Sequence, residues 1–104
     1  MAVEIANDET LNAQLGKHPK VVVKYYADWC GSCKLFAAKY KRLSGDERFA
    51  DTVFLDIDAE HNPEARKLAG VDTLPFFATF KNGELVKALS TAKEESLVEM
   101  LTAL

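Results

Sequence analysis

The sequence lacks most features that mark a nucleic-acid-binding, membrane-spanning or disulfide-stabilised protein. Its formal net charge is −3, so it has no basic excess for nucleic acid or an anionic membrane surface. No segment approaches the roughly 20 apolar residues that a membrane-spanning helix needs. It holds only two cysteines, and a chain of 104 residues can bury one core without disulfide scaffolding. We therefore expect a globular protein with no nucleic-acid partner and no membrane partner.

The sequence also has no internal repeats and no linker-like stretches. The first residues, MAVEIANDET, have neither a basic start nor a long apolar run, so we expect no signal peptide. The length fits one domain over residues 1–104, which we expect to be a cytoplasmic monomer. In a reducing cytosol, a pair of cysteines is more often catalytic or metal-bound than structural.

Apolar spacing and turn signals predict strands that alternate with helices along the chain. Residues 21–27, VVVKYYA, are nearly all apolar and predict a central strand buried on both faces. Asn62-Pro63 predicts the N-cap and first turn of a helix, and Asn82-Gly83 predicts a hairpin turn. The predicted order is β-α-β-α-β-α-β-β-α, with strands at residues 3–6, 21–27, 52–58, 76–80 and 84–89. The fold class is therefore α/β, a central mixed sheet with helices on both faces.

Both cysteines lie in the segment ADWCGSCK, residues 27–34, where the central strand ends and the next helix begins. At a helix N-terminus, free N–H groups and the helix dipole stabilise a thiolate relative to a thiol. Cys33 follows Cys30 by nearly one helical turn, so the two sulfurs can close a small disulfide ring. This arrangement indicates a redox couple in which Cys30 attacks and Cys33 resolves the mixed disulfide. Asp28 and Lys34 flank the couple, and we expect them to be mainly solvated and to tune it weakly.

Two other roles for a Cys-x-x-Cys pair are a zinc site and a structural disulfide. A structural zinc ion takes four ligands, whereas this pair supplies two, and His18 and His61 lie in separate predicted loops. A disulfide ring this small constrains the unfolded chain weakly. The residues therefore favour redox chemistry and no metal, although a dimer could still pool two cysteine pairs around zinc.

The segment ADWCGSCK closely resembles the active site of the thioredoxin family, Trp-Cys-Gly-Pro-Cys-Lys, with Ser32 in place of the proline. The resemblance covers essentially the whole chain, including the segments LDID, VDTLPFF and FKNGEL. It implies a thioredoxin fold in which Pro75 follows a cis peptide bond beside the cysteines. It also implies a surface that binds an extended substrate segment, formed by Trp29, Gly31, Ser32, Thr73, Leu74 and Pro75.

The resemblance further implies a protein-disulfide reductase, with Cys30 as the nucleophile and Cys33 as the resolving thiol. The electrons reside on this couple, so we expect no bound cofactor. The implied partners are proteins that carry disulfides and a thioredoxin reductase that re-reduces the couple. Two alternatives stay open: an electron-relay or more oxidising relative, and a thioredoxin-fold binding module whose cysteines are dispensable.

Four positions depart from the family pattern. Lys24 stands where typical thioredoxins have a buried aspartate behind the second cysteine, and Phe54 stands where many have a lysine that faces this aspartate. Ala38 replaces a common helix proline, which predicts a straighter helix. Ser90 falls near a glycine of the substrate-binding loop, at a point where this loop is about one residue shorter.

Lys24 has two interpretations. In the first, its alkyl chain lies in the core and its ammonium extends to water or to an acid such as Asp56 or Asp58. In the second, Lys24 lies near Cys33 and affects the second cysteine directly. Burial would favour the neutral amine, which could accept the thiol proton, whereas an ammonium would stabilise the thiolate.

Overall fold

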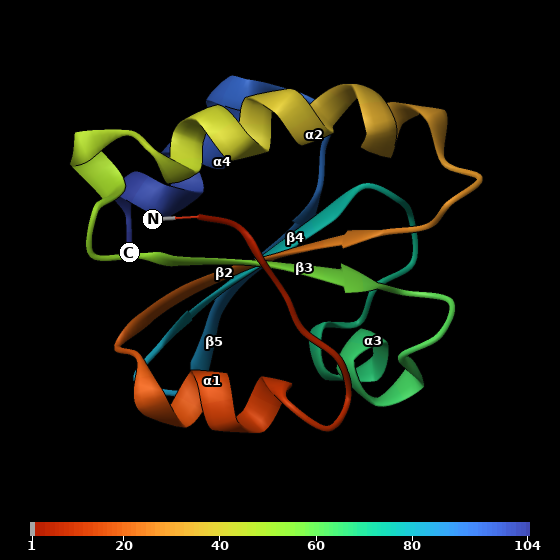
Figure 1. Ribbon diagram of the computed structural model, residues 1–104, viewed down its shortest axis with the longest axis horizontal. Coiled ribbons are helices and arrows are strands. Elements are labelled where there is room, and N and C mark those ends of the chain that lie inside the picture. The colour runs from red at the N-terminus through yellow and green to blue at the C-terminus, as the bar shows by residue number, and fades with distance from the viewer. Residues whose placement is uncertain (1) are drawn as a thin grey trace.

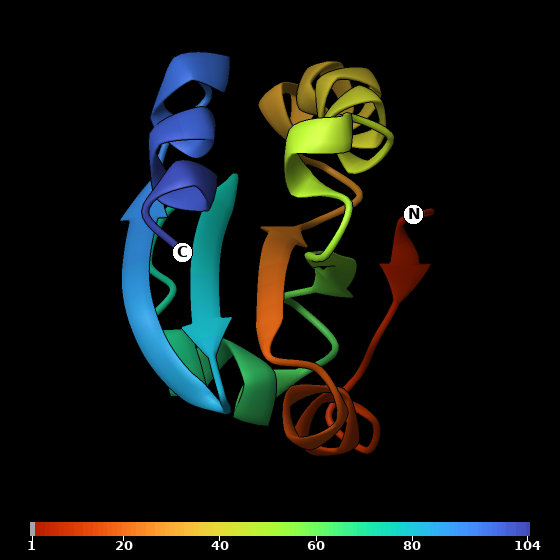
Figure 2. The same cartoon turned by 90° about the vertical axis from the view of Figure 1, so that its left-hand side faces the viewer.

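The structure, a computed structural model that describes residues 2–104, contains five strands and four α-helices. In chain order they are β1 (Glu4–Ile5), α1 (Leu11–Lys17), β2 (Lys20–Tyr26), α2 (Gly31–Ser44), β3 (Val53–Asp58), α3 (Pro63–Ala69), β4 (Phe76–Lys81), β5 (Glu84–Ser90) and α4 (Glu94–Thr102). The strands form one sheet in the order β1-β3-β2-β4-β5 (Figure 1). Helices α1 and α3 cover one face of the sheet, and α2 and α4 cover the other (Figures 1 and 2). The predicted α/β fold class and element order are confirmed.

Strand β2 lies in the middle of the sheet, as its apolar sequence predicts. It pairs in parallel with β3 and antiparallel with β4. Residues 21–25 are all buried, and Lys24 among them is only 3% exposed. In the strand register, Lys24 lies beside Asp56 of β3 and Phe77 of β4. The sheet therefore places a lysine inside the molecule with a carboxylate on the neighbouring strand.

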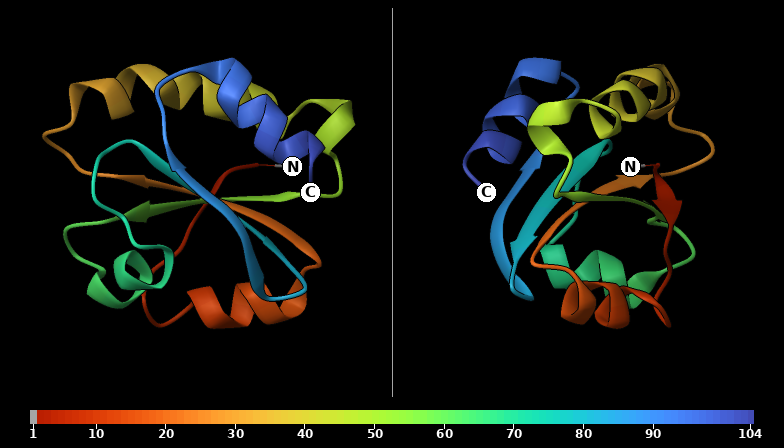
Figure 3. Two further views of the ribbon diagram at one scale, coloured as in Figure 1. Left: turned by 180° about the vertical axis from the view of Figure 1, so that it is seen from behind. Right: turned by 60° about the vertical axis from the view of Figure 1, so that its left-hand side comes forward.

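The antiparallel part of the sheet ends in the hairpin of β4 and β5, which curves along one edge (Figure 3). Asn82 and Gly83 form its turn with φ values of 53° and 84°. These values lie in the left-handed region, which asparagine and glycine tolerate best. The predicted Asn-Gly hairpin turn is confirmed.

An aromatic layer fixes α2 against the sheet. The ring of Tyr40 packs on Phe54, with centroids 5.2 Å apart, so Phe54 fills core space in this layer. The Tyr40 hydroxyl lies 3.1 Å from the Val22 carbonyl oxygen and 2.8 Å from the Leu55 carbonyl oxygen. Because these carbonyls belong to adjacent strands, Tyr40 fixes the position of the helix that begins after Cys30.

The start of α3 corrects one prediction. Asn62 occupies the predicted N-cap position, but its side chain makes no capping hydrogen bond. The Asp8 carboxylate accepts hydrogen bonds from the backbone N–H groups of Glu64, at 3.2 Å, and Ala65, at 2.7 Å. The Asn62 side chain accepts from the Asp8 N–H and donates to the Asp58 carbonyl. Asp8, from a distant segment, thus caps α3 in place of Asn62. The Asn62 side chain instead connects two loops through its hydrogen bonds to Asp8 and Asp58.

Candidate active site

The two cysteines lie at the junction of β2 and α2. Cys30 is the N-cap residue of α2, and its sulfur accepts a hydrogen bond from the Cys33 backbone N–H at 3.1 Å. The two sulfurs form a disulfide, with Cα atoms 5.3 Å apart. Both residues are buried, and Cys33 is only 3% exposed. A hydrogen-bond donor and the positive end of the α2 dipole therefore face the sulfur of the first cysteine.

The predicted recognition residues include one that contacts the cysteine pair and several that are exposed. The peptide bond between Leu74 and Pro75 is cis, as the resemblance implied, and Leu74 packs against the cysteine pair. Trp29 is 68% exposed, which places its indole on the surface and not in the core. Gly31, Ser32 and Thr73 are also exposed. Leu74 thus lies at the cysteine pair, and Trp29, Gly31, Ser32 and Thr73 are accessible at the surface, while the role of these residues in substrate binding stays a prediction.

Two contacts that orient this surface were not predicted from the sequence. The Trp29 indole N–H donates to the Glu60 carboxylate, which lies in the loop after β3. The Ser90 hydroxyl at the end of β5 donates to the Pro75 carbonyl oxygen at 3.1 Å. Ser90 therefore supports the loop of the cis-proline. The sequence does not predict the contact between Trp29 and Glu60, because no spacing rule relates residues in two separate loops.

Lys24 lies in a cavity shared with the second cysteine. This cavity, of about 190 Å³, is lined by residues of β2, β3 and α2 and of the loop between β2 and α2. They are Lys24, Tyr26, Ala27, Asp28, Cys33, Lys34, Ala37 and Asp56. The predicted tuning residues Lys24, Asp28 and Lys34 thus surround one space next to Cys33.

The structure bears on both interpretations of Lys24. Its ammonium nitrogen lies 3.3 Å from Asp56 Oδ1, which matches the first interpretation. It also lies 5.1 Å from the centre of the Tyr40 ring, a distance that suits a cation–π contact. The shared cavity with Cys33 matches the second interpretation. The first interpretation is therefore matched by the contact with Asp56, and the second only in the location of Lys24, so a direct effect on Cys33 stays a prediction.

The Asp56 carboxylate is the acid next to this lysine. Its side chain is 24% exposed, and its Oδ1 is buried without a hydrogen bond of good geometry from any described residue. The contact with Lys24 is therefore close enough for an ion pair but poorly aligned for a hydrogen bond. Burial raises the pKa of Asp56, and the Lys24 ammonium opposes this rise.

Asp58, the other acid considered for Lys24, has a different partner. Its Oδ2 lies 2.8 Å from Nδ1 of His61, and this contact raises the pKa of His61. Within residues 2–104, no three side chains of His, Cys, Asp or Glu lie together as a metal-binding group. Over the same range, no helix has both the length and the apolarity to cross a bilayer.

The comparisons with known proteins agree with this geometry. The family model described as Thioredoxin matches residues 2–103. The chain is 44% identical over 81 residues to the chloroplastic F-type thioredoxin of Brassica napus, a match that covers 75% of this chain and 42% of that protein. It is 34% identical over 84 residues to the thioredoxin of Gallus gallus, covering 81% of this chain and 78% of that one.

Solved structures give the same result. Thioredoxin f from spinach chloroplast, in its short form, superposes with a TM-score of 0.90 at 30% identity and covers 98% of this chain and 92% of that one. A complex of ferredoxin:thioredoxin reductase and thioredoxin f2 matches with a TM-score of 0.85 at 33% identity, covering 98% and 94% of the two chains. The predicted thioredoxin fold is confirmed.

The relatives overturn the predicted cytoplasmic localisation. Five of them, all F-type thioredoxins of plants, are named as chloroplastic. The match spans less than half the length of each of these five proteins, 42% to 44%. The cytoplasmic prediction was therefore wrong, because the sequence of a folded domain does not specify the compartment in which the protein resides.

Proposed function

Because this chain belongs to the thioredoxin family, we propose that it is a dithiol–disulfide oxidoreductase that reduces disulfides in other proteins. The observation that carries this proposal is the Cys30–Cys33 pair at the N-terminus of α2, next to the cis bond before Pro75. The free N–H groups there favour the Cys30 thiolate, which is the nucleophile of disulfide exchange. The cysteine couple itself is the redox centre.

The reaction consists of two exchanges. The Cys30 thiolate attacks one sulfur of the substrate disulfide, which forms a mixed disulfide and releases the other substrate sulfur as a thiolate. Cys33 then loses its proton and attacks the Cys30 sulfur, which closes the Cys30–Cys33 disulfide and releases the second substrate thiolate. Both substrate thiolates take protons from water. Two electrons thus pass from the protein dithiol to the substrate.

The exposed residues around the cysteines suit an extended substrate segment. The backbone at Thr73 and Leu74 would pair with the main chain of the substrate, as one strand adds to another. The exposed indole of Trp29 would supply an apolar contact on the other side of the disulfide. Gly31 and Ser32 present little side-chain bulk over the first cysteine, so a substrate sulfur can approach it.

The proposed partners are proteins with accessible disulfides and a reductase that returns electrons to the couple. The thioredoxin f2 among the solved relatives is described in complex with ferredoxin:thioredoxin reductase, which supports a reductase partner. We propose that the chain acts as a monomer, because both exchanges use cysteines of one chain.

The ion pair behind the couple bears on its reduction potential. An isolated ammonium at Lys24 would stabilise the Cys33 thiolate and make the couple more oxidising. The Asp56 carboxylate at 3.3 Å offsets that charge, so the pair is neutral as a whole. We therefore expect a potential near the roughly −270 mV of reducing members of this fold, well below the roughly −120 mV of an oxidant. Equilibration with glutathione or dithiothreitol buffers measures this value.

The proposed function is tested by reduction of insulin disulfides with NADPH and a thioredoxin reductase. The unmodified chain should turn over, and Cys30→Ser should abolish turnover. Cys33→Ser should accumulate a mixed disulfide that mass spectrometry detects, since the resolving thiol is missing. A Cys30→Ser variant that keeps its full activity in the assay would contradict the proposal and favour a binding module.

A further inference from the structure

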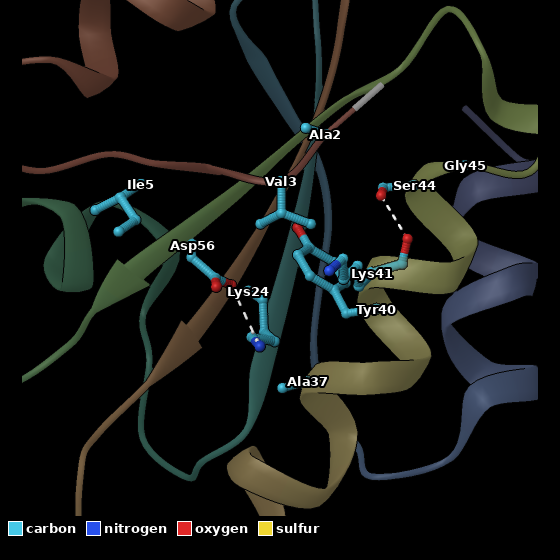
Figure 4. Close-up of a pocket in the computed structure, with 10 residues that line it drawn as sticks. All are labelled: Ala2, Val3, Ile5, Lys24, Ala37, Tyr40, Lys41, Ser44, Gly45 and Asp56. Atoms are coloured by element: carbon cyan, nitrogen blue, oxygen red, sulfur yellow. Dashed lines mark hydrogen bonds and ion pairs between the residues drawn. The ribbon is translucent and has the colours of Figure 1, made fainter.

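The buried Lys24 and the partly buried Asp56 lie between two adjoining cavities. The smaller cavity, of about 190 Å³, contains Cys33 among its lining residues. The larger one, of about 640 Å³, lies between residues 2–5, α2 and the sheet. Lys24, Ala37 and Asp56 line both. Figure 4 shows the ion pair at the larger cavity, with the Lys24 and Asp56 side chains pointing toward one another from neighbouring strands.

The resolving step requires a proton acceptor near Cys33. A thiol must become a thiolate before it attacks, and an unperturbed cysteine ionises only near pH 8.5. Cys33 is 3% exposed, so water has little direct access to its sulfur. Of the two carboxylates around the smaller cavity, Asp28 is exposed, whereas Asp56 has a buried oxygen without an aligned hydrogen bond. That oxygen lies 3.3 Å from the Lys24 ammonium, and a carboxylate oxygen has a second lone pair that can accept a proton.

We propose that Asp56 accepts the Cys33 proton in the resolving step and that Lys24 is the positioning residue that holds this carboxylate at the cavity. This inference rests on the proposed function and adds a residue to it. The acid that the family pattern places on the central strand is absent here, since that position is Lys24. In the strand register, Asp56 of β3 lies directly beside Lys24, so the neighbouring strand supplies the acid instead.

The proton and electron transfers balance. The Cys33 thiol gives its proton to the Asp56 carboxylate, and the resulting thiolate attacks the Cys30 sulfur of the mixed disulfide. The Cys30–Cys33 bond forms, the bond between Cys30 and the substrate breaks, and the substrate sulfur leaves as a thiolate. Asp56 then returns its proton to water through the larger cavity, which it also lines. The next cycle begins with the carboxylate ionised.

The surroundings of Asp56 suit this role. Burial raises its pKa toward that of a thiol, which makes it a better proton acceptor, while the Lys24 ammonium keeps the carboxylate form accessible. Other titratable or charged groups face the same two cavities and enter the pH dependence of the step. They are Tyr26, Asp28, Lys34, Tyr40 and Lys41.

The test uses the full chain with dithiobis(nitrobenzoate), which reports the two exchanges separately. Attack by Cys30 releases one coloured thiolate, and attack by Cys33 on the resulting mixed disulfide releases the second. The chain has no other cysteines, so the two absorbance phases belong to these residues alone. In Asp56→Asn, the first phase should keep its rate, and the second should slow by about tenfold or more near pH 7, because a general base has been removed.

The pH profile separates loss of a base from loss of structure. In the unmodified chain, the second phase should change little between about pH 6 and 8, because the acceptor is internal. In Asp56→Asn it should rise by close to tenfold per pH unit, since only the spontaneously formed thiolate reacts. Asp56→Glu keeps an acid at this position and should recover most of the rate.

A matched control comes from the other end of β2. Lys20 and Asp51 form an ion pair at the same 3.3 Å separation, but Asp51 is 71% exposed. Asp51→Asn removes an equal charge and should leave both phases unchanged. The inference is overturned if Asp56→Asn resolves the mixed disulfide at the original rate with the original pH profile. The proposed function would survive that result, because it depends on the loss of activity in Cys30→Ser.

Discussion

Replacing Lys24 with methionine tests the energetic role of the buried ion pair. The change keeps an unbranched chain of similar length but removes the ammonium that lies 3.3 Å from Asp56. The remaining carboxylate is then held in a largely apolar region without its counter-charge. Loss of one partner of a buried pair destabilises a protein because the other charge stays desolvated. Lys24→Met should therefore lower the free energy of unfolding at neutral pH.

The magnitude follows from the distance and the burial. Two unit charges 3.3 Å apart attract by about 5 kcal/mol at an effective dielectric constant of about 20. Breaking a fully buried pair costs roughly 3–5 kcal/mol after desolvation is counted. Because the Asp56 side chain keeps 24% exposure, we expect a smaller loss, about 2–3 kcal/mol. That corresponds to a fall in Tm of roughly 10 °C or more for a domain of this size.

The loss should depend on pH with a defined sign. The pKa of Asp56 is raised in the folded state, so folded protein binds this proton more readily than unfolded protein does. The cost of the desolvated carboxylate is thus present above the folded-state pKa and disappears as the pH falls through it. Without Lys24 that pKa rises further. The stability difference between the unmodified chain and Lys24→Met should be largest at pH 7 and shrink toward about pH 4.

Urea unfolding of the oxidised protein at several pH values measures this difference. Lys20→Met provides the control, because its pair with Asp51 is exposed and should contribute less than about 1 kcal/mol. The double variant Lys24→Met/Asp56→Asn closes a thermodynamic cycle and should be more stable than the sum of the single changes predicts. The reasoning is refuted if Lys24→Met unfolds at the same urea concentration as the unmodified chain at pH 7.

Two further predictions concern the contacts that hold the site in place. Asp8→Ala should destabilise the protein by about 1 kcal/mol in urea unfolding, because it removes the cap of α3 at Glu64 and Ala65; an unchanged midpoint would contradict that role. Tyr40→Phe keeps the ring but removes the hydroxyl that bonds the strand carbonyls, and thermal unfolding should show a loss of about 1–2 kcal/mol. A Tm equal to that of the unmodified chain would show that this hydrogen bond does not fix α2.

Local patterns were sufficient to predict the chemistry of the cysteine pair. The spacing of Cys30 and Cys33 and their place between a buried strand and a helix are properties of one short segment. The helix periodicity and the Asn82-Gly83 turn are equally local, and the structure confirms that turn. The family resemblance added the cis bond before Pro75, which no spacing rule predicts.

Contacts between distant segments were decided only by the tertiary structure. The sequence named Asp56 and Asp58 as possible partners for Lys24 and could not choose between them. The parallel register of β2 and β3 sets Lys24 beside Asp56, while Asp58 at the strand end meets His61. A shift of this register would change the partner without changing the local pattern.

The capping of α3 by a residue 57 positions away from Ala65 has the same origin. Asp8 and the start of α3 come together only when both face the same end of the sheet. A sequence pattern reports the conformation of a short segment, because backbone geometry repeats along it. It does not report which polar side chains meet across the fold, since that depends on how every element packs. The cysteine couple could therefore be predicted from one short segment, whereas the pairing of Lys24 with Asp56 beside the Cys33 cavity depended on the folded sheet.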